Sequence, residues 1–290
     1  MWFLVSGILF VLAIVCVSTW GLKFGIDFTG GGLMEVKFKT ERPDVVTLQK
    51  QIEELKLDGG VQLQPAGADR YMIRFPSTDM TVHQQILDKL SAQYGKDNVQ
   101  EQRFEAVGPA IGKEMRTKAI YSVLIVLVAI VLYIAYAFRK LSWPVESWKY
   151  GVIAVIALVH DITIPIGIFA VLGQYLNVEI GLPFVAALLT VLGYSVNDTI
   201  VVFDRVREKL LRSGSKDFED LVNRSVNETL ARSINTTLTT VIALAAICLF
   251  GGDSIKYFSL ALLIGIFFGA YSSVFVASPL LVVLEKFSKK

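Results

Sequence analysis

The sequence predicts an α-helical membrane protein with six transmembrane helices and one ferredoxin-like α+β domain outside the membrane. Of its 290 residues, 53% are hydrophobic and 19% are charged, whereas soluble domains carry roughly 25% charged residues. Segments 119–138 and 258–284 contain no charged residue, and about 20 apolar residues suffice for a helix to cross a bilayer. A long polar segment separates the first two apolar ones. This composition excludes a soluble enzyme and a disordered chain.

Six apolar segments are long enough to span a membrane, and their flanking charges predict their orientation. Two loops, 139–149 and 204–232, and the C-terminal tail carry 13 Lys and Arg residues, whereas the short loops on the opposite side hold only Lys256. Because positive loops stay in the cytoplasm, we expect both termini to be cytoplasmic. The predicted spans are 2–20, 119–138, 150–172, 181–203, 233–250 and 258–284.

Three regions follow from this pattern. Residues 1–20 form the first transmembrane helix, 21–117 form the extracytoplasmic domain, and 118–290 form the other five helices. The outer segment alternates strand and helix patterns in the order β-α-β-β-α-β, which is the split unit of ferredoxin-like domains. The expected elements are strands at 33–40, 61–64, 71–75 and 99–104, a helix that begins after Asp44, and a second helix that Thr81 caps.

Glycine clusters lie on both sides of this outer domain. Gly30, Gly31 and Gly32 precede it, and Gly108 and Gly112 follow it. Glycine has few steric limits on φ and ψ, so these residues suit either ordinary turns between helix and strand or a hinge on which the domain tilts. The sequence leaves both interpretations open.

Two aspartates lie inside predicted transmembrane helices. Asp161 follows His160 in the third span, and Asp198 lies in the fourth. An Asp at the centre of a membrane helix costs about 2.5–3.5 kcal/mol on insertion scales, so each needs a partner, water or a proton. His160 and Asp161 together suggest a proton relay, but adjacent residues on a helix point about 100° apart. His160 is therefore a candidate either for proton relay or for packing.

Asp198 has several candidate partners for proton transfer. Asn197 is its neighbour, and Arg232 opens the fifth span at a position where an ion pair with Asp198 is geometrically feasible. Arg232 alternatively extends its charged end to the membrane surface. Thr236 and Thr240 either bond their own i−4 carbonyls or line a water path. We therefore list Asp198, Arg232, Asn197, Thr236, Thr240 and Asp161 as candidate proton-transfer residues.

Nothing in the sequence indicates a metal site, a cofactor or a nucleic-acid partner. His160 is the single histidine of the predicted spans, and Cys16 and Cys248 both lie in apolar segments. A histidine or thiol metal site would need several such ligands close together. No basic cluster of the size that nucleic acids require is present either.

Two further patterns concern packing. Small residues repeat every fourth position in the last span, which allows close contact between helices, and we expect this stripe to help bind a partner subunit. Segment 215–232 is amphipathic, so we expect it to lie on the cytoplasmic surface or to dock on another subunit. The stripe comprises Ala261, Gly265, Gly269, Ser273 and Ala277.

Five stretches together resemble the SecD/SecF family of protein-export membrane subunits, over essentially the whole chain. They are GIDFTGG at 25–31, VGP at 107–109, ALVHD at 157–161, GYSVNDTIVVFDR at 193–205 and RSINTT at 232–237. The resemblance implies half of a transporter of the RND superfamily, in the bacterial cytoplasmic (inner) membrane. It implies work with SecD beside the SecYEG translocon, with YajC as a further candidate partner, and use of the proton motive force to promote polypeptide translocation.

The resemblance also assigns roles to residues and leaves two rival functions. The key intramembrane acid of the family falls on Asp198 and its key basic residue on Arg232, and the role is transport rather than enzymatic catalysis. One rival is an intramembrane aspartyl protease, because two aspartates lie on neighbouring spans, although the Gly-x-Gly-Asp motif of such enzymes is absent. The other is a purely structural subunit for translocon assembly, in which Asp198 would tolerate neutral substitution.

Overall fold

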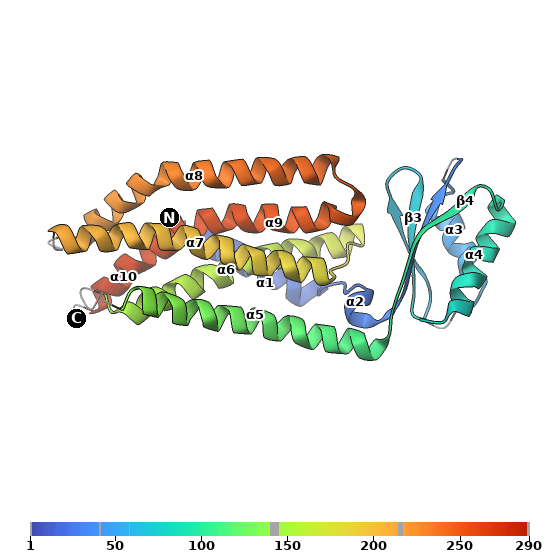
Figure 1. The fold of residues 1–290 in the computed structure, drawn as a ribbon, viewed down its shortest axis with the longest axis horizontal. Helices are drawn as coiled ribbons and strands as arrows, with labels where there is room; N and C mark the ends of the chain where they lie inside the picture. The colour runs from blue at the N-terminus through green and yellow to red at the C-terminus, as the bar shows by residue number, and fades with distance from the viewer. Residues whose placement is uncertain (1, 41, 58, 140–144, 214–216, 289–290) are drawn as a thin grey trace. The chain divides into compact units, whose positions relative to one another are not determined.

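The chain divides into two compact units in a computed structural model that describes residues 2–40, 42–57, 59–139, 145–213 and 217–288. The helical unit comprises Met1–Leu22, Tyr121–Val178 and Pro183–Lys290, and the sheet unit comprises Lys23–Ile120 and Glu179–Leu182. Figure 1 shows the elements of both units. Four of the positive residues used above to predict orientation, Lys140, Lys216, Lys289 and Lys290, lie outside the described residues.

Six helices of the described chain are long and apolar enough to cross a membrane, which confirms the six predicted spans. The sixth is continuous through a π-helical turn, η1, at Ser273–Ala277, between α9 and α10. The helices are α1 (Trp2–Trp20), α5 (Pro109–Ala137), α6 (Ser147–Leu176), α7 (Leu182–Ser213), α8 (Phe218–Phe250), α9 (Asp253–Ser272) and α10 (Ser278–Ser288).

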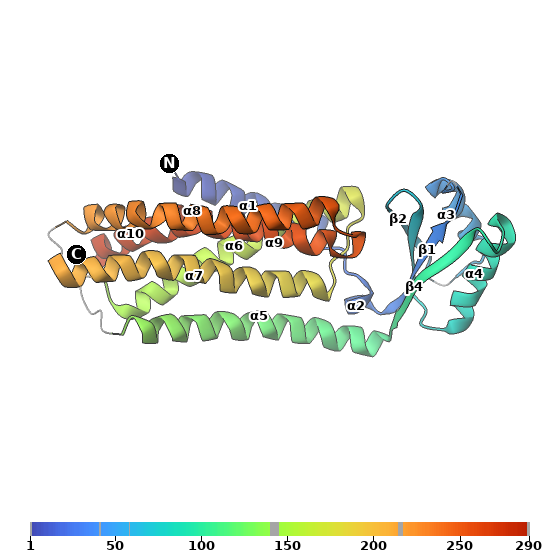
Figure 2. The same ribbon diagram turned by 45° about the horizontal axis from the view of Figure 1, so that its top comes forward.

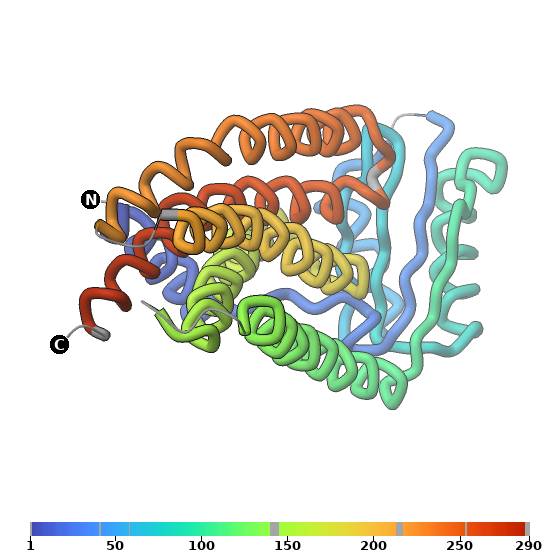
Figure 3. The backbone as a smooth tube through the Cα atoms, turned by 60° about the vertical axis from the view of Figure 1, so that its left-hand side comes forward, coloured from blue at the N-terminus to red at the C-terminus, as the bar shows by residue number. Residues whose placement is uncertain are grey.

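The amphipathic segment expected on the membrane surface is instead the first part of α8. The helix runs without a break from Phe218 to Phe250, as the orange tube of Figure 3 shows. Its apolar face, with Phe218, Leu221 and Val222, is buried in a core that also contains Leu281. The hydrophobic stripe is therefore covered by this chain's own helices, which explains why it is apolar. Residues 215 and 216 lie outside the described residues.

The sheet unit has the predicted ferredoxin-like topology. Four antiparallel strands lie in the order β2-β3-β1-β4, and α3 and α4 lie against one face of the sheet (Figure 2). A short helix, α2, precedes the sheet. The bounds are α2 (Ile26–Thr29), β1 (Gly31–Phe38), α3 (Val45–Glu53), β2 (Gln62–Ala66), β3 (Arg70–Phe75), α4 (Met80–Tyr94) and β4 (Val99–Val107).

Aspartates cap both long helices of the sheet unit. The Asp44 carboxylate accepts from the Val46 N–H at 3.0 Å, as expected for α3. The expected Thr81 cap of α4 is wrong, because the N-cap is Asp79, whose carboxylate accepts from the Thr81 N–H at 2.9 Å. That N–H holds the pKa of the Asp79 carboxyl below its usual value. Both residue types cap helices, so sequence alone did not separate the two positions.

Residues 179–182, between α6 and α7, belong to the sheet unit. Ile180 forms backbone hydrogen bonds with Lys23 at 2.8 Å and with Gly25 at 2.9 Å. The Asp27 carboxylate accepts from the Leu182 N–H at 2.7 Å, and Glu179 forms an ion pair with Arg74. Burial lowers the pKa of Arg74 to about 10. This loop is therefore built into the unit as an integral part.

Two buried carboxylates form the candidate functional site

Asp198 is held by two serine hydroxyls inside the helical unit. It lies on α7, and only 9% of it is exposed. Ser233 on α8 donates to Asp198 Oδ1 at 2.5 Å, and Ser273 in η1 donates to Oδ2 at 2.6 Å. Both oxygens of the carboxylate are thus bound to neutral donors from two other elements. Hydrogen bonds to an ionised group are among the stronger ones in proteins.

The structure does not bring Arg232 to Asp198. Arg232 is exposed, and within the described chain it forms no ion pair with Asp198. Its neighbour Ser233 faces the carboxylate instead, and successive residues of a helix diverge by about 100°. Arg232 therefore projects away from the position that Ser233 occupies. Asn197 is exposed as well, for the same reason on α7.

The threonines of α8 bond their own helix, which is one of the two alternatives that the sequence left open. Thr236 Oγ1 donates to the Arg232 carbonyl at 2.8 Å, and Thr240 Oγ1 donates to the Thr236 carbonyl at 3.0 Å. The Thr240 hydroxyl also lies 3.3 Å from the Tyr194 hydroxyl on α7. Thr236 is exposed, whereas Thr240 is half-buried and lies against α7.

Asp161 is the centre of a second polar cluster and is fully buried. Its Oδ2 accepts from Ser195 at 2.5 Å and from Ser272 at 2.7 Å. Its Oδ1 lies 2.9 Å from His160 Nδ1, so the adjacent side chains contact each other despite their divergence along the helix. His160 Nε2 is buried and has no hydrogen-bond partner. The sequence pointed to this pair but not to its serine partners.

Four serines that the sequence did not single out as ligands hold the two carboxylates. Ser272 and Ser273 are consecutive, and Ser273 begins η1. A π-helical turn inside an α-helix often marks a functional site. Ser278 donates to the Ser273 carbonyl at 2.7 Å and fixes this turn. The missed ligands are Ser195, Ser233, Ser272 and Ser273.

The small-residue stripe packs against α7 of the same chain. A Cβ at Gly269 would lie 2.8 Å from the Ser195 Cβ, and one at Gly265 would collide with Val191. The stripe residues Ala261 and Ala277 are fully buried. The predicted close helix contact is therefore confirmed, but the neighbour at Gly265 and Gly269 is α7 of the same chain rather than a partner subunit. Its close packing instead brings Ser195 into the site.

The first three candidate hinge glycines have packing roles within the sheet unit. Gly30 has a φ of 77°, and a Cβ there would lie 2.8 Å from the Pro109 Cα. Gly31 has a φ of 115°, and a Cβ there would lie 2.6 Å from the Phe75 carbonyl oxygen. Gly32 pairs with Phe75 in the sheet. These positions favour glycine whether or not the segment bends.

The other two candidates differ from each other. A Cβ at Gly112 would lie 2.9 Å from the Gly30 nitrogen, whereas a Cβ at Gly108 would meet nothing within 4 Å. Gly108 also has no positive φ. Its glycine identity therefore has no packing explanation, and the hinge stays a prediction that Gly108 tests best.

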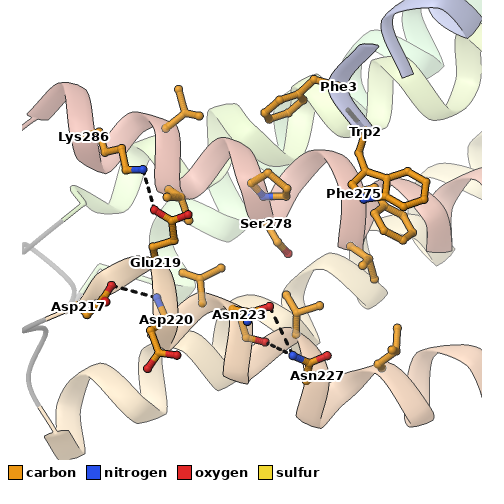
Figure 4. Close-up of a pocket in the computed structure, with 17 residues that line it drawn as sticks. Trp2, Phe3, Asp217, Glu219, Asp220, Asn223, Asn227, Phe275, Ser278 and Lys286 are labelled. Carbon is orange, nitrogen blue, oxygen red and sulfur yellow. Dashed lines mark hydrogen bonds and ion pairs between the residues drawn. The ribbon is translucent and has the colours of Figure 1, made fainter. Parts of the chain in front are cut away.

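An open cavity of about 690 Å³ lies in the helical unit beside the π-helical turn. Figure 4 shows the Trp2 and Phe275 rings at one end and the Lys286–Glu219 ion pair, 2.7 Å long, at the other. Ser278 lines it between them. Solvent space thus lies next to the residue that bonds the Ser273 carbonyl. The described residues contain no cluster of three or more His, Cys, Asp or Glu that could hold a metal ion.

Comparisons with known proteins converge on one family. The model of the SecD/SecF protein-export membrane protein, C-terminal, matches residues 86–287, and the SecD/SecF GG motif matches residues 21–41. Protein translocase subunit SecF of Thermobaculum terrenum is 42% identical, over 98% of this chain and 91% of that protein. SecF of Desulfurispirillum indicum is 43% identical, over 96% and 87%.

A solved structure extends the similarity to three dimensions. The crystal structure of SecDF from Thermus thermophilus, a translocon-associated membrane protein, matches with a TM-score of 0.85 at 35% identity. The match covers 97% of this chain and 37% of that one. The present chain thus spans little more than a third of SecDF.

Proposed function

This multi-pass membrane chain belongs to the SecD/SecF family, and we propose that it acts in the Sec machinery as a proton-driven subunit that promotes polypeptide translocation. The name shared by its relatives, protein translocase subunit SecF, supports the export role. The observation that carries the proton-driven part is Asp198, a carboxylate buried in a membrane helix and bound by Ser233 and Ser273. Structural stability alone gives little reason to keep a buried acid, because apolar replacements often stabilise such sites.

The chain works as one half of a complex with SecD. In SecDF the two parts form one chain, of which this chain matches 37%. The exposed polar residues of α7 and α8 support a covering partner, because polar groups in contact with lipid are costly. They include Asn197, Arg232, Asn235 and Thr236. SecYEG, YajC and the translocating polypeptide are further partners of this proposal.

In the proposed cycle, Asp198 carries the proton and Arg232 acts as its electrostatic switch. A guanidinium close to the carboxylate favours the ionised form, and its removal from a poorly polarisable site favours the neutral acid. Ser233 and Ser273, rather than Arg232, contact the carboxylate in this structure, and our proposal takes this geometry as the separated state. Each charge that crosses the membrane releases about 2.3 kcal/mol per 100 mV, which is enough to bias a helix rearrangement.

The membrane orientation belongs to the same proposal. The protein lies in the bacterial cytoplasmic membrane with both termini in the cytoplasm and the sheet unit outside. The excess of Lys and Arg in loops 139–149 and 204–232 supports this orientation. Protons would then enter from the outer side and leave to the cytoplasm, while the sheet unit acts on the emerging polypeptide.

The decisive experiment replaces Asp198 in the complex with SecD, reconstituted with SecYEG in proteoliposomes. Asp198→Asn keeps size and hydrogen bonding but does not titrate, so we expect proton flux and the force-dependent part of export to be lost while assembly is retained. Asp204→Asn is the matched control. Asp204 lies on the same helix, is 67% exposed at its side chain and pairs with Arg207 at 3.6 Å, so it should change neither readout.

Each other result points to a named alternative. Normal proton-coupled export by Asp198→Asn would overturn the proposal in favour of a purely structural subunit. Cleavage of a peptide substrate that an aspartyl-protease inhibitor blocks would favour the protease. In the described chain no hydrogen bond joins the Asp161 and Asp198 carboxylates, whereas the two acids of an aspartic protease share one proton at close range.

A further inference from the structure

Two adjacent serines each hold a different buried acid. Ser272 donates to Asp161 at 2.7 Å, and Ser273 donates to Asp198 at 2.6 Å. The two acids lie on different helices, α6 and α7, so the end of α9 is where the two clusters meet. Ser195 and Asp198 are also one turn apart on α7. A change at either acid therefore acts on the same two helical segments.

Each of these serines has a second acceptor ready. The Ser272 hydroxyl lies 3.1 Å from the Gly269 carbonyl, and the Ser273 hydroxyl lies 2.9 Å from the Ala270 carbonyl. A hydroxyl has one donor and two acceptor positions. When the carboxylate gains a proton, the new O–H can donate to the serine oxygen while the serine hydrogen turns to the backbone carbonyl. The cluster can thus hold either protonation state without losing a hydrogen bond.

One ring nitrogen of His160, Nε2, has no hydrogen-bond partner among the described residues. If Nδ1 carries a hydrogen and donates to Asp161 Oδ1, the Nε2 lone pair is left buried without a donor. The ring lies between Phe10 and Tyr271, each with its centroid 6.4 Å away. Buried polar atoms without partners are rare in folded proteins. His160 therefore acts on the cluster through Nδ1 alone, beside the buried Asp161 carboxylate.

We propose that His160 and Asp161 form a second proton-binding site, coupled to Asp198 through Ser272 and Ser273. The proposal rests on the proton-driven function above and adds a second acid to it. One proton binds on Asp161, beside His160, and the hydroxyl of Ser272 turns from the carboxylate to the Gly269 carbonyl. The π-helical turn transmits this change to Ser273, because the two residues share one backbone segment.

Few other charged groups bear on this coupling. The described titratable residues near the two clusters are His160 and Asp161 on α6, Tyr194 and Asp198 on α7, Arg232 on α8 and Tyr271 on α9, and the Tyr194 hydroxyl contacts Thr240. Arg232 is exposed, and Tyr271 uses its hydroxyl toward Ser6 on α1 at 3.0 Å. Interacting acids titrate as a pair, so we expect a change at Asp161 to alter the titration of Asp198.

Infrared titration of the full complex with SecD, in nanodiscs and deuterated buffer, tests the coupling. We expect two carboxyl bands to titrate, one lost in Asp161→Asn and the other in Asp198→Asn. Asp161→Asn and Ser272→Ala should each move the Asp198 midpoint by about one pH unit. Ser259→Ala is the matched control, because Ser259 is buried on the same helix but donates to the Ile255 carbonyl alone, and it should move neither band.

The inference and the proposed function fail in different ways. A single titrating band that Asp161→Asn leaves unchanged would overturn the second site, and so would an Asp198 midpoint that Ser272→Ala moves no more than Ser259→Ala does. Proton flux measured on the same complexes tests the function separately. Wild-type complexes without flux would overturn the proton-driven function, even with two titrating bands.

Discussion

The two units of this protein place polar and apolar groups in opposite ways. The core of the sheet unit consists of apolar side chains such as Met34, Val36 and Ile73. Several of its ion pairs lie at the surface, for example Lys89 with Glu54, whereas the Arg74–Glu179 pair is largely buried. In the helical unit the outer helices expose their apolar faces. In the most hydrophobic stretch of α5, for example, only 6% is buried inside the unit. A set of its polar side chains is buried in the interior around Asp161 and Asp198.

This contrast shows that the solvent of each unit, water or lipid, determines which side chains that unit can bury. In water, apolar burial drives folding, so a polar side chain inside the sheet unit needs a partner, as His83 has in Glu101 and Arg74 has in Glu179. In lipid the outside is as apolar as the inside, and polar contacts between helices become part of what joins them. The serine-bound acids are thus compatible with a stable helical unit, whereas an acid without a partner in the apolar core of the sheet unit is not.

The largest expected effect comes from placing an acid in the apolar core of the sheet unit. Ile73 is fully buried in β3, so in Ile73→Asp an unpaired carboxylate would be buried at a cost of several kcal/mol. That is comparable with the whole stability of a domain, about 5–15 kcal/mol. Hydrogen exchange on the full chain should show that the strands of the sheet unit lose protection.

The control for this experiment uses the same chemistry on the surface. Val46 in α3 is 60% exposed, so Val46→Asp should leave the exchange pattern unchanged. If β3 keeps its protection from hydrogen exchange in Ile73→Asp, the contrast between the two units fails. The sheet unit would then also accommodate a buried acid that has no partner.

An intermediate effect is expected at Gly112. A Cβ there would press on the backbone of Phe28 and Gly30 at 2.9–3.1 Å, and overpacking typically costs about 1–3 kcal/mol. Gly112→Ala should therefore lower the local opening free energy of the sheet unit, as measured by hydrogen exchange. Gly108→Ala, which meets open space, should change it by less than about 0.5 kcal/mol.

The same pair of variants separates packing from hinge motion. If Gly108 is a hinge, Gly108→Ala should slow export although the sheet unit keeps its stability. Export at the wild-type rate would assign the glycines to packing and turns alone.

The smallest effect is expected at a helix cap. Asp44 caps α3 through the Val46 N–H, and loss of such a cap typically costs about 1 kcal/mol. Hydrogen exchange should show earlier opening of the first turn of α3 in Asp44→Ala. Asp44→Ser keeps an acceptor and should retain most of the protection. Equal loss in both variants would contradict a capping role.

Periodicity and composition predicted most of the fold. Six apolar segments became six long helices, and the alternating pattern of the outer segment became the four-stranded sheet. These signals are strong because burial repeats along an element. A helix start is weaker, since it depends on one residue, and Asp79 rather than Thr81 caps α4.

The site was predicted in its acids but not in their ligands. Asp161 and Asp198 stood out because charge is rare in membrane helices. Ser273 belonged to a stripe of small residues, and nothing in the sequence separates a serine that packs from one that donates. The Ser233 contact instead of Arg232 depends on the rotation of α8 about its axis, which spacing alone does not set. The π-helical turn has no sequence signature either.

The close approach at Gly269 restricts which amino acids can occupy position 195. The Ser195 hydroxyl donates to Asp161 at 2.5 Å. A Cβ added at Gly269 would lie 2.8 Å from the Cβ of Ser195. Alanine fits this space but lacks the hydroxyl, and threonine has the hydroxyl but adds a methyl group. Serine meets both demands. A residue larger than glycine at position 269 would press on the Ser195 side chain and disturb the hydroxyl that Asp161 uses.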